Sequence, residues 1–279
     1  MDKLSALLAS FSLQTGVFYT GNICGVHDFE RDTRRGHMHL VKRGPVQVLG
    51  LEPQQFLIER PTLLFLPRPE RHRLVADERA GADVVCATVE FGGGGVNPIT
   101  SSLPSVVQVE LAAMPGVEAL LELMFDEAFA DHNGKQAVLD RLCEVLIIRL
   151  LRHSMDMGLA CGGTLAAMAD PRLSKAVLLM HERPAAPWSL EDLATEAGMS
   201  RARFAVRFRE VTGDTPADYL ASWRLLLAQR LLKRGLPLKV VALDVGYGSA
   251  SALNRVFVRK LGAAPMQWLK TQQAEPPNE

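Results

Sequence analysis

The sequence lacks long apolar runs and contains few cysteines. No apolar stretch in the 279 residues approaches the roughly 18 residues that a membrane-spanning helix needs. Four cysteines are too few for a disulfide-built fold of this length, and we expect free thiols, metal ligands or redox sensors. Asp2 and the lack of a small-residue cleavage site argue against a signal peptide. We therefore expect a cytoplasmic protein without a membrane partner.

The formal net charge is zero, because 31 Lys and Arg balance 31 Asp and Glu. The two parts of the chain nevertheless differ in charge. Residues 1–169 hold 15 basic against 20 acidic residues, whereas 170–270 hold 16 against 9. A basic part joined to an acidic part fits a polyanion-binding domain attached to a domain with another task. Uneven solvated charge is the plainer alternative.

Short β-type runs fill the first 110 residues. Runs such as Thr62–Leu66 and Val84–Val89 are apolar or β-branched, and glycine, proline and charged residues separate them at close spacing. This pattern predicts a small barrel or sandwich over 1–110.

The periodicity becomes helical after Gly116. Apolar residues recur at helical spacing over 117–125, and a second helix is predicted over 135–153. Because the apolar positions of the second helix cover more than one stripe, it should bury two faces. We expect this helical pair, 111–155, to form a homodimer interface, with an ordinary core helix as the alternative. Small residues over 156–169 then predict a linker.

One residue pattern occurs twice between Trp188 and Lys270. The first copy has Leu193, Ala194, Gly198, Phe204, Phe208, Gly213, Pro216 and Tyr219, and the second has Val241, Ala242, Gly246, Leu253, Phe257, Gly262, Pro265 and Trp268. The offset is 48 residues up to the glycine of the turn and 49 after it. A repeat of this length indicates a duplicated unit. A small residue for helix crossing and a glycine for the turn predict two helix-turn-helix motifs in an all-α domain over 170–271.

The second helix of the first copy follows Ser200, whose side chain suits an N-cap. Phe204 and Phe208 are four residues apart and should face the core. The arginines on the remaining faces are placed to meet phosphates and guanine edges. The residues expected to contact DNA here are Ser200, Arg201, Ala202, Arg203, Ala205, Val206 and Arg207.

The second copy presents Ala250, Ser251, Asn254 and Arg255. Asn254 suits bidentate contact with adenine, and Arg255 suits guanine or a phosphate. A helix predicted over 216–233 separates the copies and would span roughly 27 Å at about 1.5 Å per residue. That length approaches the roughly 34 Å between successive major-groove segments on one face of DNA. For any one of these residues, a solvated surface position is the alternative.

These motifs resemble the DNA-binding domain of AraC/XylS-type transcription regulators. The resemblance covers about a hundred residues and rests on Ser189–Ala194, Gly198–Ser200, Phe204, Phe208, Gly213, Pro216, Val240–Ala242, Val245–Tyr247, Ser249, Asn254, Arg255, Phe257, Gly262 and Pro265. Leu253 departs from it, because an aromatic residue is usual there. The resemblance implies a sequence-specific regulator that acts on double-stranded DNA and with RNA polymerase. It also implies base reading in the first copy by Ala202, Arg203, Ala205 and Val206.

Two histidine-bearing segments, Gly36–Gly44 and Leu66–Leu74, precede Cys86. They resemble the two cupin motifs in the sensor domain of one AraC-family branch, the RclR-like branch. The resemblance implies a cupin-like β-barrel, which makes the expected fold class α+β, and some members of that branch sense oxidants with cysteines. Enzymatic cupins complete a metal site with a carboxylate, whereas Lys42 and Arg43 stand at that place here.

The histidines and cysteines of this region form a candidate sensing site. His37 and His39 should point to one face of a strand, because side chains two residues apart do so. A set of Cys24, His39, His72 and Cys86 would suit tetrahedral zinc or copper(I) as cofactor. The two thiols beside histidines would alternatively form a regulatory disulfide on oxidation. A buried structural cluster and a small-molecule effector site are further alternatives.

Two classes of function follow from these features. The first is a DNA-binding transcription regulator that is no enzyme and is controlled by an oxidant, a metal or a small molecule at the N-terminal domain. The second is a metal-dependent cupin enzyme with a DNA-binding appendage. The missing carboxylate argues against the second class.

Overall fold

A computed structural model describes residues 2–32, 34–51, 54–92 and 97–274. The chain forms two compact units. One comprises Ser12–Gly92 and Ile99–Cys161, and the other comprises, among the described residues, 2–11, 97–98 and 162–274. Within the described ranges, no helix is long and apolar enough to cross a membrane.

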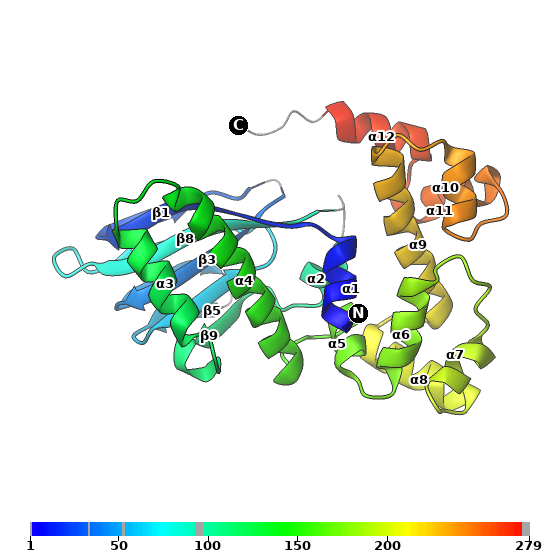
Figure 1. The fold of residues 1–279 in the computed structure, drawn as a ribbon, viewed down its shortest axis with the longest axis horizontal. Helices are drawn as coiled ribbons and strands as arrows, with labels where there is room; N and C mark the ends of the chain where they lie inside the picture. The colour runs from blue at the N-terminus through cyan, green and yellow to red at the C-terminus, as the bar shows by residue number, and fades with distance from the viewer. Residues whose placement is uncertain (1, 33, 52–53, 93–96, 275–279) are drawn as a thin grey trace. The chain divides into compact units, whose positions relative to one another are not determined.

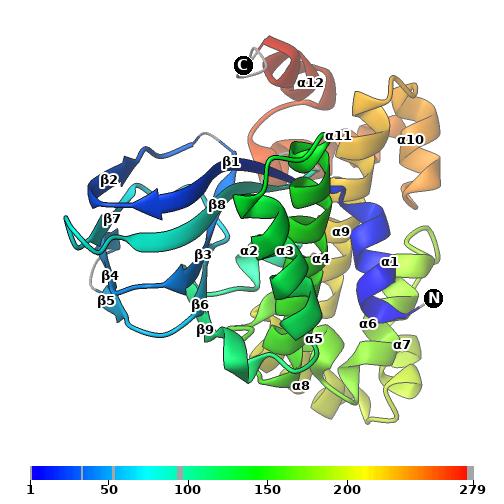
Figure 2. The same cartoon turned by 60° about the vertical axis from the view of Figure 1, so that its left-hand side comes forward.

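The first unit, which we call the sensor unit, is built on two antiparallel sheets (Figures 1 and 2). The larger sheet has the strand order β1-β8-β3-β6-β9 and the smaller one β2-β7-β4-β5. The strands are β1 (Leu13–Ile23), β2 (Gly25–Phe29), β3 (Gly36–Arg43), β4 (Val46–Leu51), β5 (Gln54–Ile58), β6 (Thr62–Leu66), β7 (His72–Ala76), β8 (Ala82–Phe91) and β9 (Val107–Glu110).

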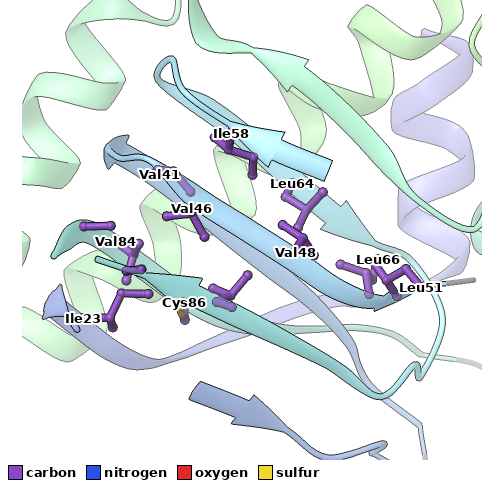
Figure 3. Packing of buried hydrophobic residues seen from close by; sticks show 13 residues of the cluster. Ile23, Val41, Val46, Val48, Leu51, Ile58, Leu64, Leu66, Val84 and Cys86 are labelled. Atoms are coloured by element: carbon purple, nitrogen blue, oxygen red, sulfur yellow. The ribbon is translucent and has the colours of Figure 1, made fainter. Parts of the chain in front are cut away.

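Strand β3 lies at the centre of the larger sheet, and its residues from Gly36 to Val41 are all buried. Alternate residues of a strand face opposite sides of the sheet, so both faces of β3 are covered. An apolar cluster fills the space between the sheets, with Leu64 and Cys86 from the larger sheet and Val48 and Leu74 from the smaller (Figure 3 labels most of it). Each fully buried aliphatic side chain of this kind contributes about 1.5–3 kcal/mol.

Two helices pack on the sensor unit beside β1. They are α3 (Glu118–Phe129) and α4 (Lys135–Asp156), with the short α2 (Pro98–Ser101) and the 3-10 turn Leu111–Ala113 before them. The backbone N–H of Val17 donates to Oδ1 of Asp140 at 2.8 Å, and the hydroxyl of Thr15 donates to the carbonyl of Asp140 at 2.6 Å. The predicted helix over 135–153 is confirmed. It buries Leu139 and Leu146 but leaves Val138 and Val145 exposed.

The second unit, which we call the helical unit, contains nine helices among the described residues (Figure 1). They are α1 (Lys3–Ser10), α5 (Gly163–Ala169), α6 (Leu173–Glu182), α7 (Leu190–Glu196), α8 (Arg201–Thr212), α9 (Pro216–Lys233), α10 (Leu238–Asp244), α11 (Ala250–Leu261) and α12 (Pro265–Ala274). Helices α7 and α8 form the first helix-turn-helix motif, α10 and α11 form the second, and α9 joins them. The predicted α+β class with a helical C-terminal part is confirmed.

Local sequence explains where these helices begin and turn. Ser189 and Asp192 form a capping box at the start of α7, in which each side chain bonds to the backbone N–H of the other residue. Gly198 and Gly246 take positive φ angles of 62° and 88° in the two turns, where a side chain would be strained. Pro216 opens α9, where its missing N–H has no partner to lose.

Helix α1 belongs to the helical unit, although we expected 1–110 to form the sensor domain. Leu7 is fully buried, and Phe11 packs edge-on against Trp223 with ring centroids 5.7 Å apart. Arg230 of α9 donates hydrogen bonds to the carbonyls of Ala9 and Ser10 at 3.3 and 3.0 Å. The apolar stripe of α1 needs a partner surface, and α6 supplies it, while α9 adds the contacts of Trp223 and Arg230.

The expected linker over 156–169 is wrong at its second half. Gly163–Ala169 is helix α5, and its residues Thr164, Leu165, Ala167 and Met168 are buried. Alanine and methionine favour helices. The glycines before them suggested a flexible segment, but the apolar side chains that follow find a buried position in the helical unit.

Candidate functional site

The inner face of α8 is held by two phenylalanines. Phe204 and Phe208 are fully buried, and the ring of Phe208 meets that of Tyr219 edge-on at 5.3 Å between centroids. Because the two rings hold one face of α8 inside the helical unit, Arg203 and Arg209 point outward and are exposed. The packing of the inner face therefore determines which side chains of α8 point outward.

Arg207 differs from the other arginines of α8 because a carboxylate holds it. Its Nε and Nη2 donate to Oδ2 of Asp170 at 3.1 and 2.8 Å. Burial raises the pKa of Asp170, but hydrogen bonds from the backbone of Leu173 and Arg172 and from Arg207 outweigh burial and lower it. The sequence predicted that Arg207 contacts DNA but did not predict this ion pair. The pair connects α8 to the start of α6.

Helix α11 has a similar inner face but a different outer one. Leu253 and Phe257 are fully buried, and Trp268 meets Phe257 edge-on at 6.0 Å. The Oγ of Ser249 accepts a hydrogen bond from the N–H of Ala252 at 3.2 Å and caps the helix. These contacts leave the opposite face of α11 outward.

None of the eleven residues expected to contact DNA is buried. Ala205, Ala250 and Asn254 are half-buried, and the others are exposed, namely Ser200, Arg201, Ala202, Arg203, Val206, Arg207, Ser251 and Arg255. Their contacts with DNA remain a prediction.

A cluster of histidines joins the two sheets of the sensor unit. His39 of β3 has its Nε2 2.7 Å from Nε2 of His72 of β7, and its Nδ1 3.1 Å from Sγ of Cys86 of β8. His72 Nδ1 lies 3.0 Å from the carbonyl oxygen of Glu70. The ring of His37 lies 5.2 Å from that of His72 between centroids. The structure thus brings together four of the five residues predicted for sensing.

The carbonyl of Glu70 sets the direction of this hydrogen-bonded chain. A carbonyl only accepts, so Nδ1 of His72 carries a proton. A neutral His72 then accepts at Nε2 from His39, which leaves Nδ1 of His39 to accept from the thiol of Cys86. Burial lowers the pKa of His39 and His72, and that of His37 to about 4, so the rings are neutral near pH 7. Burial also raises the pKa of the Cys86 thiol, which keeps its proton.

Cys24 lies apart from this cluster, so the predicted set of Cys24, His39, His72 and Cys86 is not formed. Strand β1 pairs Tyr19 with Cys86. Cys24 follows Tyr19 by five residues, which is about 16 Å along a strand at roughly 3.3 Å per residue. A disulfide requires Cα atoms within about 7 Å, so the strands would have to separate. Among the residues that the structure describes, no group of three or more His, Cys, Asp or Glu is placed to hold a metal ion.

Phe29 is a member of the cluster that sequence reasoning missed. Its ring stacks on His72 with centroids 5.1 Å apart and meets His39 edge-on at 4.7 Å. Phe29 pairs with His72 across β2 and β7. The apolar residue at the end of β2 was visible in the sequence, but its strand register was not.

Two family models match the chain, Cupin over residues 2–156 and Helix-turn-helix domain over 193–271. A putative AraC-like transcription regulator of Streptomyces antibioticus is 36% identical over 74% of this chain and 77% of its own length. An uncharacterized HTH-type transcriptional regulator of Haemophilus influenzae is 29% identical, covering 87% of this chain and 88% of its own. The RCS-specific HTH-type transcriptional activator RclR of Escherichia coli is 27% identical, covering 82% of each chain.

These relatives are transcription regulators, which confirms the prediction of a transcription regulator and gives the enzyme alternative no support. The match to the cupin model covers more than half of the chain, and the helix-turn-helix match falls on the duplicated motifs. The chain belongs to the AraC-like transcription regulators, with a cupin domain at its N-terminal side and a helix-turn-helix domain that binds DNA.

Proposed function

We propose that this regulator responds to a small oxidant through Cys86. The observation that carries the proposal is the contact of Cys86 Sγ with His39 Nδ1 at 3.1 Å, at one end of a hydrogen-bonded chain that reaches both sheets. The E. coli relative is named an RCS-specific activator, which supports control of this chain by a specific signal.

The surroundings of Cys86 restrict the oxidant. The side chain is fully buried and keeps its proton, so a charged reagent is excluded and the reaction is slow unless the oxidant is small and neutral. Hypochlorous acid fits. The thiol sulfur bonds to chlorine, the O–Cl bond breaks, and the hydroxide takes the thiol proton as water. Water then replaces chlorine on sulfur and hydrogen chloride leaves, which gives a sulfenic acid.

The added oxygen atom would act on the packing between the sheets. Cys86 belongs to the apolar cluster of the sensor unit, where neighbouring side chains leave little free space. Extra atoms in such a core cost about 1–3 kcal/mol. Oxidation would therefore favour a second arrangement of the sheets, and a shift in that population changes DNA binding or contact with RNA polymerase.

DNA binding before and after hypochlorite treatment tests the proposal. Wild type should change its affinity for DNA. The Cys24→Ala variant should respond in the same way, because Cys24 is exposed and outside the chain of hydrogen bonds. Cys86→Ala should not respond, and mass spectrometry should find one added oxygen on Cys86 in the wild type. A Cys86→Ala variant that responds like wild type contradicts the proposal.

A transition-metal ion is the second candidate signal, and His37 is the observation that favours it. Its Nδ1 is buried without a hydrogen-bond partner, beside two further neutral imidazoles. Neutral imidazole suits zinc and copper. The bond between His39 and His72 would have to break, because within the described part of the chain no three ligands are already placed for a metal. Equilibrium dialysis with zinc or copper(I) should load wild type but not His72→Asn, and a metal-free wild type rejects this candidate.

For the DNA contacts, we infer that the N-cap Ser200 and the ten predicted residues of α8 and α11 meet the double helix, eight of the eleven being exposed and three half-buried. Their exposure supports this role, and RNA polymerase is the expected second partner of the bound protein. Hydroxyl-radical footprinting of the wild type on an operator selected from random DNA should show two protected segments. A single segment would contradict contact by both motifs.

For assembly, we infer a cytoplasmic homodimer formed through the outer face of α3 and α4. Leu123, Val138 and Val145 support it, because they are 51%, 39% and 45% exposed although apolar. Val145→Glu should shift the protein from dimer to monomer in sedimentation analysis. A monomeric wild type at micromolar concentration contradicts this interface.

A further inference from the structure

Arg224 of α9 contacts the segment that leads into the first helix-turn-helix motif and the turn of the second. Its Nε donates to the carbonyl of Pro184 at 2.6 Å, and its Nη2 donates to the carbonyl of Ala186 at 2.9 Å. Both carbonyls belong to the segment between α6 and α7 that leads into the first motif. The same guanidinium lies over the ring of Tyr247 in the turn of the second motif, 5.6 Å from the ring centroid.

The turn of the second motif also approaches this segment directly. A Cβ atom on Gly246 would lie 2.7 Å from Cα of Ala185 and 3.0 Å from Nη2 of Arg224. Real Cβ atoms essentially never approach another atom within 3.0 Å, so the 2.7 Å contact with the backbone of Ala185 favours glycine at this position. The turn and the segment therefore meet through backbone atoms, with Arg224 beside the contact.

The segment that receives Arg224 is itself stiff. The N–H of Ala186 donates to the carbonyl of Arg183 at 3.1 Å, and the indole N–H of Trp188 donates to the same carbonyl at 3.0 Å. Pro184 and Pro187 fix their own φ angles. One residue after Trp188, the capping box starts α7. This segment and the first motif should therefore keep a fixed position relative to each other.

Arginine suits this position for a geometric reason. Its planar guanidinium offers several N–H donors in a fixed fork, so it can serve two carbonyls and still stack on an aromatic ring. Lysine carries the same charge on a single nitrogen and lacks the planar face.

We propose that Arg224 is a positioning residue, which fixes the rotation and distance between the two motifs and so sets the spacing of the two DNA segments that the protein accepts. Helix α9 alone would join the motifs as one rod. The contact through Arg224 adds a second connection away from that rod, and two connections prevent the motifs from turning about α9. This inference rests on the proposal that both motifs contact DNA.

The test measures how strictly the full-length protein discriminates operator spacing. The probe is a duplex selected by the wild type from random DNA, together with variants that have one base pair more or less between the two protected segments. Wild type should bind the altered spacings about tenfold more weakly, because one base pair displaces a segment by roughly 3.4 Å and turns it by roughly 35°. Arg224→Ala should bind the selected duplex more weakly but prefer it over the altered ones by less than about threefold.

Two further variants make the result specific. Arg224→Lys should behave like Arg224→Ala, and it carries the test if the alanine variant does not fold by circular dichroism. Arg230→Ala is the matched control, because Arg230 lies on the same helix but bonds to Ala9 and Ser10, and it should keep the wild-type preference.

An equal loss of affinity at every spacing, or an unchanged preference, in both Arg224 variants overturns the proposal. Footprinting of the wild type separates this failure from the other one. If only one segment is protected, contact by both motifs fails. If two segments are protected and the preference stays, the role of Arg224 fails.

Discussion

The two helix-turn-helix motifs share a skeleton but differ at their surfaces. Each joins a helix of 7 residues to one of 12 through a glycine turn. The buried pair is Phe204 and Phe208 in the first motif and Leu253 and Phe257 in the second. The comparison teaches that packing is conserved within this chain, while the outward side chains are free to diverge.

The outward faces of the two motifs carry different side chains. Helix α8 exposes Arg201, Arg203 and Arg209, with Arg207 held by Asp170, whereas α11 offers Asn254 and Arg255. We expect the first motif to supply much of the phosphate affinity and the second more of the hydrogen-bond discrimination between bases.

The largest expected effect tests whether the buried packing sites of the two motifs are equivalent. Phe208→Ala and Phe257→Ala should each lower the free energy of unfolding by about 3–5 kcal/mol, because each leaves a cavity. Phe208 also packs against Phe204 and Tyr219, so its loss should cost more. Urea titration followed by tryptophan fluorescence measures both. A loss of stability below about 1 kcal/mol in either variant would show that the surrounding side chains close the cavity.

Acid should destabilise the helical unit through His181. His181 of α6 stacks on Trp223, and burial lowers its pKa to about 3, below the usual 6.5. The unfolded chain therefore binds the proton more readily, and stability falls as the pH drops from about 6.5 towards 3, by at most about 1.4 kcal/mol per pH unit. All three tryptophans lie in the helical unit, so fluorescence melts between pH 7 and 4 report on it.

The His181→Gln variant provides the control for the acid experiment. It should flatten the dependence, because the side chain no longer titrates. An identical pH profile in wild type and variant would assign the acid sensitivity to other groups.

Loss of one outward arginine in each motif should have an intermediate effect. Arg203→Ala and Arg255→Ala should each weaken operator binding by about 1–3 kcal/mol, and Arg255→Ala should relax base preference more. Gel-shift titration at fixed salt against the selected operator and single-base variants measures both properties. Unchanged affinity in both variants would remove these residues from the interface.

The smallest expected effect concerns helix capping in the first motif. Ser189→Ala should destabilise the helical unit by about 1 kcal/mol, because Ser189 takes part in the capping box. Ser200→Ala should cost less, since Ser200 stands at an N-cap without a side-chain hydrogen bond. Thermal melts compare the two. Equal losses would mean that Ser200 forms its cap in solution.

Local and periodic features were predictable from the sequence, whereas long-range pairings were not. The bounds of α9, the caps and the turn glycines follow from neighbouring residues, and the duplicated pattern marks both motifs. The pair of Arg207 and Asp170 spans 37 residues and leaves no periodic trace.

The sensing site shows the same limit. The two cupin motifs indicated that His39 and His72 would approach each other, and their Nε2 atoms lie 2.7 Å apart. The position of Cys24 depends on strand register, which composition does not encode, and β1 contains an irregularity between Val17 and Tyr19. A shift of register moves a thiol along the sheet or to its other face.

The packing of α1 decides how the DNA-binding part can be isolated. A fragment that starts at residue 162 would expose the edge of Trp223 that Phe11 covers and leave Arg230 without the carbonyls of Ala9 and Ser10. Losing a buried side chain such as Leu7 would forfeit about 1.5–3 kcal/mol. A shortened protein of this kind should therefore aggregate more readily, and an affinity tag fused ahead of Lys3 would lie beside α5, because Nζ of Lys3 donates to the carbonyl of Met168 at 3.3 Å.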